Sequence, residues 1–257
     1  MIYPLVWMVM SSFKDTNTIF TTATSLIPEK FTLQNYVNGW KGFAKVGFGT
    51  FFKNSLFISI TATIGTVLSS SVVAYGFARC KFPGRKLLFA AMLASMMLPA
   101  QVLMIPQYLW YQKLNWVGTN LPLIVPYCFA IQGFFVYMMT NFIEGIPREL
   151  DEAAKIDGAN RWQLLKSVIL PMLMPTITIC TFLTLTNGFK LFDQNLALTG
   201  GNPGKMSELL ALNIYNTMYG TTGWQGVGQA KAVIFFIIVA IIALAQNKIT
   251  TSKEVQD

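Results

Sequence analysis

Residues 152–171 read E-A-A-K-I-D-G-A-N-R-W-Q-L-L-K-S-V-I-L-P, and they are the most informative stretch of the chain. The stretch is charged and favours helix, yet it lies between two apolar spans that each approach the roughly 20 residues needed to cross a bilayer. A charged helical segment between two such spans lies outside the lipid. We therefore interpret it as a docking element on a membrane protein.

The composition of the whole chain also places it in a membrane. The 257 residues are 53% hydrophobic and 12% charged, whereas a soluble domain carries about 25% charged residues. The chain has no histidine, which excludes Ser-His triads, H-E-x-x-H zinc helices and histidine proton relays. The net charge of +8 comes from Lys and Arg at the edges of apolar runs, which favours membrane topology over nucleic-acid binding. The three cysteines lie in or beside apolar runs and predict buried thiols.

The uncharged runs of the chain predict its membrane-spanning helices. We expect a single transmembrane domain over residues 1–257, with spans at about 51–77, 87–110, 118–142, 167–189 and 228–247. The long side chain of Lys231 lies near the start of the last span, and we expect it to snorkel to the outer edge of the membrane.

Residues 1–12 are apolar too, but a helix of this length covers only about 18 Å and cannot cross alone. We interpret them as a partial span, the end of a helix that begins before this chain. A signal peptide is the alternative, but no basic segment precedes these residues and no small-residue cleavage site follows them. The predicted fold class is an all-α integral membrane protein, a bundle of six core transmembrane helices of which the first is incomplete.

The positive-inside rule predicts how the spans are oriented. The link at residues 79–86 holds four basic residues and no acid, whereas the next link holds only Lys113. The first of these links is therefore predicted to face the cytoplasm. Alternation then places residues 13–50 and 190–225 outside and the 144–166 loop inside, on the side of the membrane where ATP is found.

Two features predict a bundle of closely packed and bent helices. Pro99 and Pro106 interrupt the third span, and Pro171 and Pro175 interrupt the fifth. Each proline removes a backbone hydrogen bond and bends its helix, although proline is also simply common in membrane helices. The second span carries small residues at four-residue steps, which let helix backbones approach closely in lipid. These residues are Ser55, Ser59 and Thr63 on one stripe and Thr61, Gly65 and Ser69 on another.

Local rules predict a helix, a glycine turn and a second helix within the 144–166 loop. Pro147 suits the first helical position, and three acids follow in the first turn, where the helix dipole favours them. We expect the helix to run to about Asp157 and Gly158 to end it in the left-handed conformation. Asn160 and Gln163 then match the capping pair that starts the next helix.

The first of these short helices is suited to docking. Ala153 and Ala154 keep it thin, so that a groove in a partner can approach its backbone. Glu152, Asp157 and Arg148 can supply ion pairs at the rim of such a contact. A protrusion of this kind transmits rigid-body motion. The alternative is an ordinary amphipathic helix followed by a kinked membrane helix.

The loop pattern resembles the cytoplasmic signature of permease subunits of ATP-binding-cassette importers. In this chain it runs E-A-A, three residues, Gly158, nine residues, Val168, one residue and Leu170-Pro171, with Val168 where the motif prefers Ile. Other segments resemble the maltose and multiple-sugar branch of these permeases. They are F-T-L-Q-N-Y at 31–36, A-Y-G-F-A-R at 74–79, F-P-G-R at 82–85, F-D at 192–193 and T-G-G-N-P-G at 199–204, the last with Asn202 inserted.

The resemblance implies the fold of a type I importer permease, with six core helices and a cytoplasmic coupling helix, in a bacterial-type cytoplasmic membrane. It implies three kinds of partner: a second permease subunit, two cytosolic ATPase subunits that grip the 144–166 loop, and an extracytoplasmic solute-binding protein. The chain itself is then a transport subunit and not an enzyme, and ATP and Mg²⁺ are bound by the ATPase subunits. Residues 74–126 are similar to one permease partner type and residues 192–204 to the other, so the position in a heterodimer stays open.

The resemblance further implies that the solute is a sugar or oligosaccharide, with permeases for amino acids, peptides or phosphate as alternatives. The end of the fifth span offers polar groups beside aromatic faces, which suits hydroxyl-rich rings. The residues of this predicted substrate path are Asn187, Phe189, Phe192, Asp193 and Asn195. A collar at the outer membrane interface is the alternative for them.

Two other functions fit the sequence less well. A secondary transporter needs an ionisable group deep in a span, and the predicted spans hold no acid in their interiors. The glycines near residue 200 do not form a Walker A loop, because Thr199 stands where the motif needs Gly and Met206 where it needs Ser or Thr. We therefore expect ATP to bind elsewhere.

Overall fold

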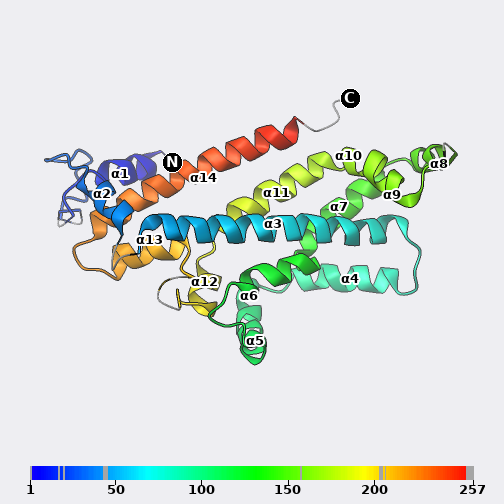
Figure 1. The fold of residues 1–257 in the computed structure, drawn as a ribbon, viewed down its shortest axis with the longest axis horizontal. Helices are drawn as coiled ribbons and strands as arrows, with labels where there is room; N and C mark the ends of the chain where they lie inside the picture. Colours follow the sequence, from blue (N-terminus) through cyan, green and yellow to red (C-terminus); the bar gives the residue numbers. More distant parts are fainter. Residues whose placement is uncertain are drawn as a thin grey trace. The chain divides into compact units, whose positions relative to one another are not determined.

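The structure is a computed structural model that describes residues 2–16, 18–19, 21–42, 46–156, 158–202, 205 and 207–252. The single transmembrane domain expected over residues 1–257 stays a prediction, and within the structure the chain forms two compact units. Unit 1 comprises Met1–Ile58, Trp116–Asn120 and Asn187–Ile242. Unit 2 comprises Ser59–Asn115, Leu121–Thr186 and Ala243–Asp257. The long helices α3 (Phe48–Arg79) and α14 (Gln225–Thr251) contribute residues to both (Figure 1).

Unit 1 is built from short helices around the first part of α3 and most of α14. They are α1 (Tyr3–Ser11), α2 (Gln34–Lys41), α12 (Asp193–Leu198) and α13 (Leu210–Tyr219). The side chain of Lys231 on α14 is buried here, and its Nζ donates hydrogen bonds to Asn213 Oδ1 at 2.8 Å and Thr217 Oγ1 at 2.9 Å. The snorkelling predicted for Lys231 is therefore wrong, because α13 supplies polar partners inside the unit.

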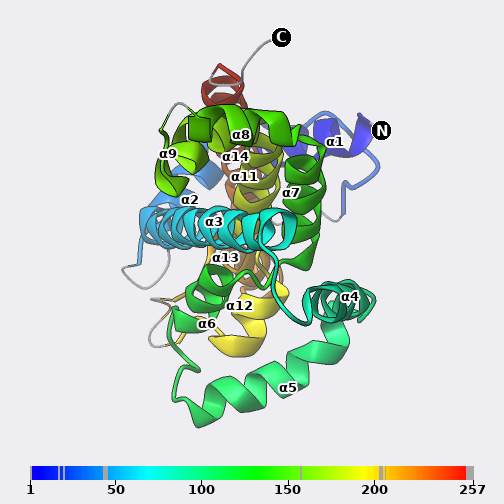
Figure 2. The same cartoon turned by 90° about the vertical axis from the view of Figure 1, so that its right-hand side faces the viewer.

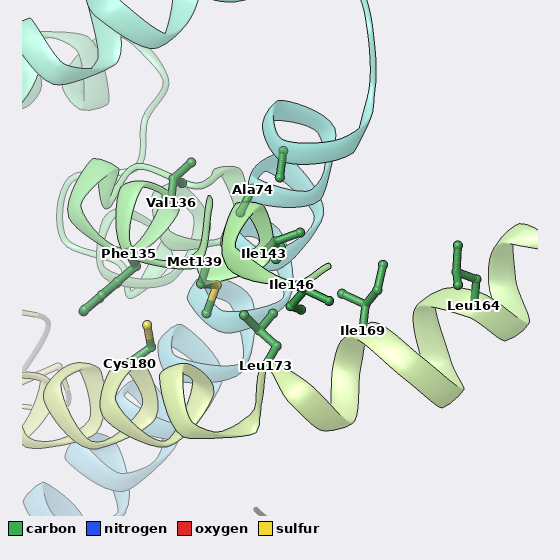
Figure 3. Packing of buried hydrophobic residues seen from close by; sticks show 11 residues of the cluster. Ala74, Phe135, Val136, Met139, Ile143, Ile146, Leu164, Ile169, Leu173 and Cys180 are labelled. Carbon is green, nitrogen blue, oxygen red and sulfur yellow. The ribbon is translucent and has the colours of Figure 1, made fainter. Parts of the chain in front are cut away.

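Unit 2 continues from the rest of α3 through a series of helices. They are α4 (Arg85–Met96), α5 (Ala100–Lys113), α6 (Leu121–Ile124), a 3₁₀ helix (Val125–Phe129), α7 (Gly133–Gly145), α8 (Arg148–Ile156), α9 (Arg161–Leu164), a π-helix (Leu165–Ile169), α10 (Leu170–Met172) and most of α11 (Met174–Phe189). Its apolar core forms where α3, α7 and the helices after α9 meet. In Figure 3, Ile143 and Ile146 point toward Ile169 and Leu173.

Several helices are long and apolar enough to cross a membrane. By length and composition they are α3, the segment Leu121–Gly145 and α14, together with the pair Trp162–Met172 and Met174–Phe189, which is bent by 71°. These helices cover four of the predicted spans. The bend falls where prolines were expected to cause one, since Pro171 and Pro175 cannot donate backbone hydrogen bonds.

The span predicted at 87–110 is divided into two helices. α4 ends at Met96, Pro99 has the extended conformation with ψ 134°, and α5 begins at Ala100. Proline disfavours helical geometry in the residue before it, so the break precedes Pro99, whereas Pro106 stays inside α5. The prediction of buried thiols holds for Cys180 only, because Cys80 and Cys128 are exposed.

Candidate coupling site

The helix at the centre of the predicted docking loop is α8. It begins at Arg148, directly after Pro147, whose carbonyl accepts a hydrogen bond from Leu150 N at 3.3 Å. Glu149 and Asp151 lie in its first turn, where the partial positive charge of the helix N-terminus stabilises carboxylates. Pro147 thus stands just before the helix and not at its first position, a difference of one residue from the prediction.

The end of α8 has the geometry predicted from Gly158. This residue has φ +83°, in the left-handed region, and Ala159 N donates to the Ala154 carbonyl at 2.9 Å. The bond spans six residues and closes a Schellman motif, the usual end of a helix at a left-handed glycine. Asp157, predicted to supply a rim charge, lies outside the described residues.

The start of the next helix is also capped as predicted. Asn160 N donates to Gln163 Oε1 at 2.8 Å, and Gln163 N donates to Asn160 Oδ1 at 2.9 Å. This reciprocal pair is the capping box expected from the sequence. The helix, glycine turn and second helix of the loop are therefore confirmed, and α8 and α9 lie next to each other in Figures 1 and 2.

The exposed side of the loop carries more apolar surface than the sequence predicts. Arg148, Glu152 and Ala153 are exposed, as a docking role requires, whereas Ala154 is half-buried and packs against the core. Two large apolar side chains are exposed as well, Ile156 to 85% and Trp162 to 77%. We call the exposed residues Leu150, Glu152, Ala153, Ile156 and Trp162 the outer face.

The inner side of α8 is fixed by a buried ion pair that sequence reasoning missed. Arg79 Nε lies 3.2 Å from Asp151 Oδ2, and the two side chains are only 7% and 11% exposed. Arg79 Nη2 also donates to the Ile146 carbonyl at 2.8 Å. The sequence alone indicates that Arg79 is one of the basic residues that orient the chain in the membrane and that Asp151 is an acid in the first turn of a helix. Their 72-residue separation leaves no local pattern that pairs them.

A second ion pair joins α4 to α7, and a cavity adjoins α8. Arg85 Nη2 donates to Glu144 Oε1 at 2.6 Å, and this pair is largely exposed. A cavity of about 420 Å³ lies beside Arg79 and Asp151. Its lining residues are Tyr75, Arg79, Cys80, Lys81, Arg148, Asp151, Glu152 and Leu164.

The five residues of the predicted substrate path lie in unit 1, around the end of α11 and α12, but in different environments. Asn187 and Asp193 are exposed, and Phe192 packs against Tyr215 with ring centroids 5.0 Å apart. Phe189 is buried. Asn195 is buried and holds the chain between α12 and α13: it donates to Thr199 Oγ1 and the Ser207 carbonyl and accepts from Leu209 N. Of the five, Phe189 and Asn195 are therefore buried within unit 1, and the other three reach its surface.

Comparison with known sequences gives consistent relatives. Residues 67–251 match the family described as binding-protein-dependent transport system inner membrane component. The diacetylchitobiose uptake permease NgcG of Streptomyces coelicolor is 34% identical over 85% of this chain and 73% of its own length. The trehalose/maltose permease MalG of Thermococcus litoralis is 30% identical over 98% and 88%. AmyD of Thermoanaerobacterium thermosulfurigenes, a probable permease for starch degradation products, is 44% identical over 52% of this chain, and the match spans 46% of AmyD.

Comparison with solved structures supports the fold. A chain of a bacterial ABC transporter that imports the acidic polysaccharide alginate matches with a TM-score of 0.82 at 20% identity, covering 96% of this chain and 90% of that one. A chain of the MetNI methionine ABC transporter matches with a TM-score of 0.57 over 80% of this chain and 95% of that one. From the family match and these relatives, the chain belongs to the inner-membrane permease components of binding-protein-dependent ABC transport systems.

Proposed function

We propose that this permease imports a sugar or oligosaccharide by alternating access, driven by ATPase subunits that dock on the outer face. The observation that carries the proposal is the outer face itself, which exposes Ile156 and Trp162 on a loop whose other side is fixed in the core. Large exposed apolar side chains with charged neighbours mark a protein interface. The solutes of NgcG, MalG and AmyD, which are diacetylchitobiose, trehalose or maltose, and starch degradation products, support the saccharide class.

The proposed assembly has a second permease subunit, two cytosolic ATPase subunits and an extracytoplasmic binding protein. ATP and Mg²⁺ are bound by the ATPase subunits, and their closure moves α8. The helix Trp162–Met172 begins within the loop and is bent by 71° from Met174–Phe189, so displacement of α8 acts on a helix that is already broken. ATP hydrolysis supplies the free energy, and the different affinities of the two transporter states for nucleotide couple it to the change of conformation.

Substitution at the outer face tests the docking role. Ile156→Asp places a charge in the centre of the proposed contact, and we expect the amount of co-purifying ATPase to fall at least about tenfold, which corresponds to about 1.4 kcal/mol. The matched control is Ile27→Asp, the same change at a residue of unit 1 that is 66% exposed, and it retains the ATPase. Equal recovery of ATPase with both variants contradicts the docking role.

The substrate path is tested in two steps. Phe192, Tyr215 and Tyr219 form a row of neighbouring rings beside the exposed Asp193, and aromatic faces with adjacent polar groups suit sugars. We expect Asn187→Ala combined with Asp193→Ala to reduce uptake of maltose, trehalose or diacetylchitobiose, whichever the wild type imports, while the protein keeps its Tm. Asn195→Ala should instead lower the Tm, because it removes three buried hydrogen bonds. Unchanged uptake by the double variant would contradict a role of Asn187 and Asp193 in the substrate path.

A further inference from the structure

We infer that Arg79 and Asp151 form a brace that makes α8 move as one body with the Ser59–Arg79 part of α3. In this role Arg79 is a positioning residue for the coupling of ATP hydrolysis to transport. The inference rests on the proposed function, and it concerns a different side of α8 from the outer face.

The backbone alone does not fix the orientation of α8. Before the helix, the chain passes through Ile146, which has ψ 124° and lies outside any helix, and Pro147. After the helix, the chain turns at Gly158 with φ +83°. Both connections are non-helical, so a force applied to the outer face would rotate α8 unless side chains hold it.

Ala154 packs against the core on one side of α8, and the Arg79 guanidinium holds the start of the helix at two points. It contacts the Asp151 carboxylate in the first turn of α8 and donates to the Ile146 carbonyl just before the helix. Nη2 makes the hydrogen bond to Ile146, whereas the contact with Asp151 is electrostatic, because Nε has no hydrogen-bond partner. Because both side chains are largely buried, salt screens the pair less than it screens a surface pair.

The sequence around Arg79 explains why it reaches α8. Ala74 and Ala78 on the same helix are buried in the core with Ile143 and Ile146, and their small side chains let α3 and α7 pack closely. Arg79 follows at the last residue of α3, where its side chain extends past the end of α7 to α8. The A-Y-G-F-A-R segment at 74–79 is thus the part of α3 that contacts the core and α8.

The test measures solute imported per ATP hydrolysed by the reconstituted complex, using whichever of maltose, trehalose and diacetylchitobiose the wild type imports. Arg79→Gln and Asp151→Asn should lower this ratio at least fivefold while the ATPase subunits still co-purify, because the outer face is unchanged. The double variant Arg79→Gln with Asp151→Asn leaves no buried charge unpaired. If a single variant fails to accumulate in the membrane, the ratio is therefore measured on the double variant. A purely structural role would change the amount of complex and not the ratio.

Arg85→Gln is the matched control, since it breaks the nearby exposed pair with Glu144 without touching α8. It should keep the wild-type ratio. A wild-type ratio in the double variant, or an equal loss in Arg85→Gln, overturns the brace. A wild-type complex that neither retains ATPase nor imports on ATP addition would instead overturn the proposed function, so the two failures are distinguishable.

Discussion

Gly158 is the residue whose conformation the loop depends on most directly. Its φ of +83° is left-handed, and a Cβ built on it would meet nothing within 4 Å. Substitution therefore acts through backbone conformation and not through a clash. A non-glycine residue in this region costs about 1–2 kcal/mol, and β-branched residues are the least tolerant of it, whereas Asn is among the most tolerant.

We predict that Gly158→Val lowers ATP-driven uptake about tenfold or more and leaves basal ATP hydrolysis by the complex in place, whereas Gly158→Asn stays near wild type. Uptake and hydrolysis measured on the same proteoliposomes check this. Gly84→Val is the control, because Gly84 has φ +80° and equally open surroundings but lies before α4. Full uptake by Gly158→Val would show that the turn does not take part in coupling.

At the scale of elements, the close approach of α3 to the 3₁₀ helix depends on Gly65. A Cβ at this position would lie 2.7 Å from Cys128 Sγ and 3.3 Å from the Cys128 backbone. About one helical turn after Gly65, Ser69 Oγ donates to the Tyr127 carbonyl at 3.2 Å and accepts from Ala130 N at 3.0 Å. Gly65 and Ser69, two residues of one predicted small-residue stripe, therefore lie where α3 meets the 3₁₀ helix.

We predict that Gly65→Ala destabilises the protein by about 1–3 kcal/mol through overpacking, seen as a lower Tm in detergent. Adding Cys128→Ala should restore part of the loss, because it removes the nearest atom. Gly76→Ala is the control within α3: nothing lies within 4 Å of a Cβ there, so it should be neutral or slightly stabilising. If Gly65→Ala and Gly76→Ala change the Tm equally, the close approach of α3 to the 3₁₀ helix does not contribute to stability.

The contrast between elements shows what sequence reasoning can reach. Uncharged runs predicted α3 and α14, and capping rules predicted both ends of the Gly158 turn, because these signals are local. Counting uncharged residues could not reveal the break at Pro99, since a broken span and a continuous one have the same composition. The Arg79–Asp151 pair and the buried Lys231 depend on which helices pack together, and no spacing along the chain encodes that.

At the scale of the whole molecule, the orientation in the membrane follows from charge. The basic link after α3 and the loop around α8 belong to one compact unit, unit 2, and the positive-inside rule predicts that both face the cytoplasm. The exposed thiol of Cys80 in this link reports on that orientation. Ile27, in the segment predicted to be outside, is exposed and provides the opposite reporter when changed to Cys.

We predict that a membrane-impermeant maleimide labels Cys80 in inside-out vesicles washed free of peripheral proteins, and not in intact cells. A chain with Ile27→Cys and Cys80→Ser should show the reverse. Both chains also carry Cys128→Ala, which removes the other exposed thiol. Cys180 is kept because it is buried and therefore slow to react. Labelling of Cys80 from outside would place α8 away from ATP and would contradict the ATPase docking site, since an ATP-driven subunit cannot reach a loop on the far side of the membrane.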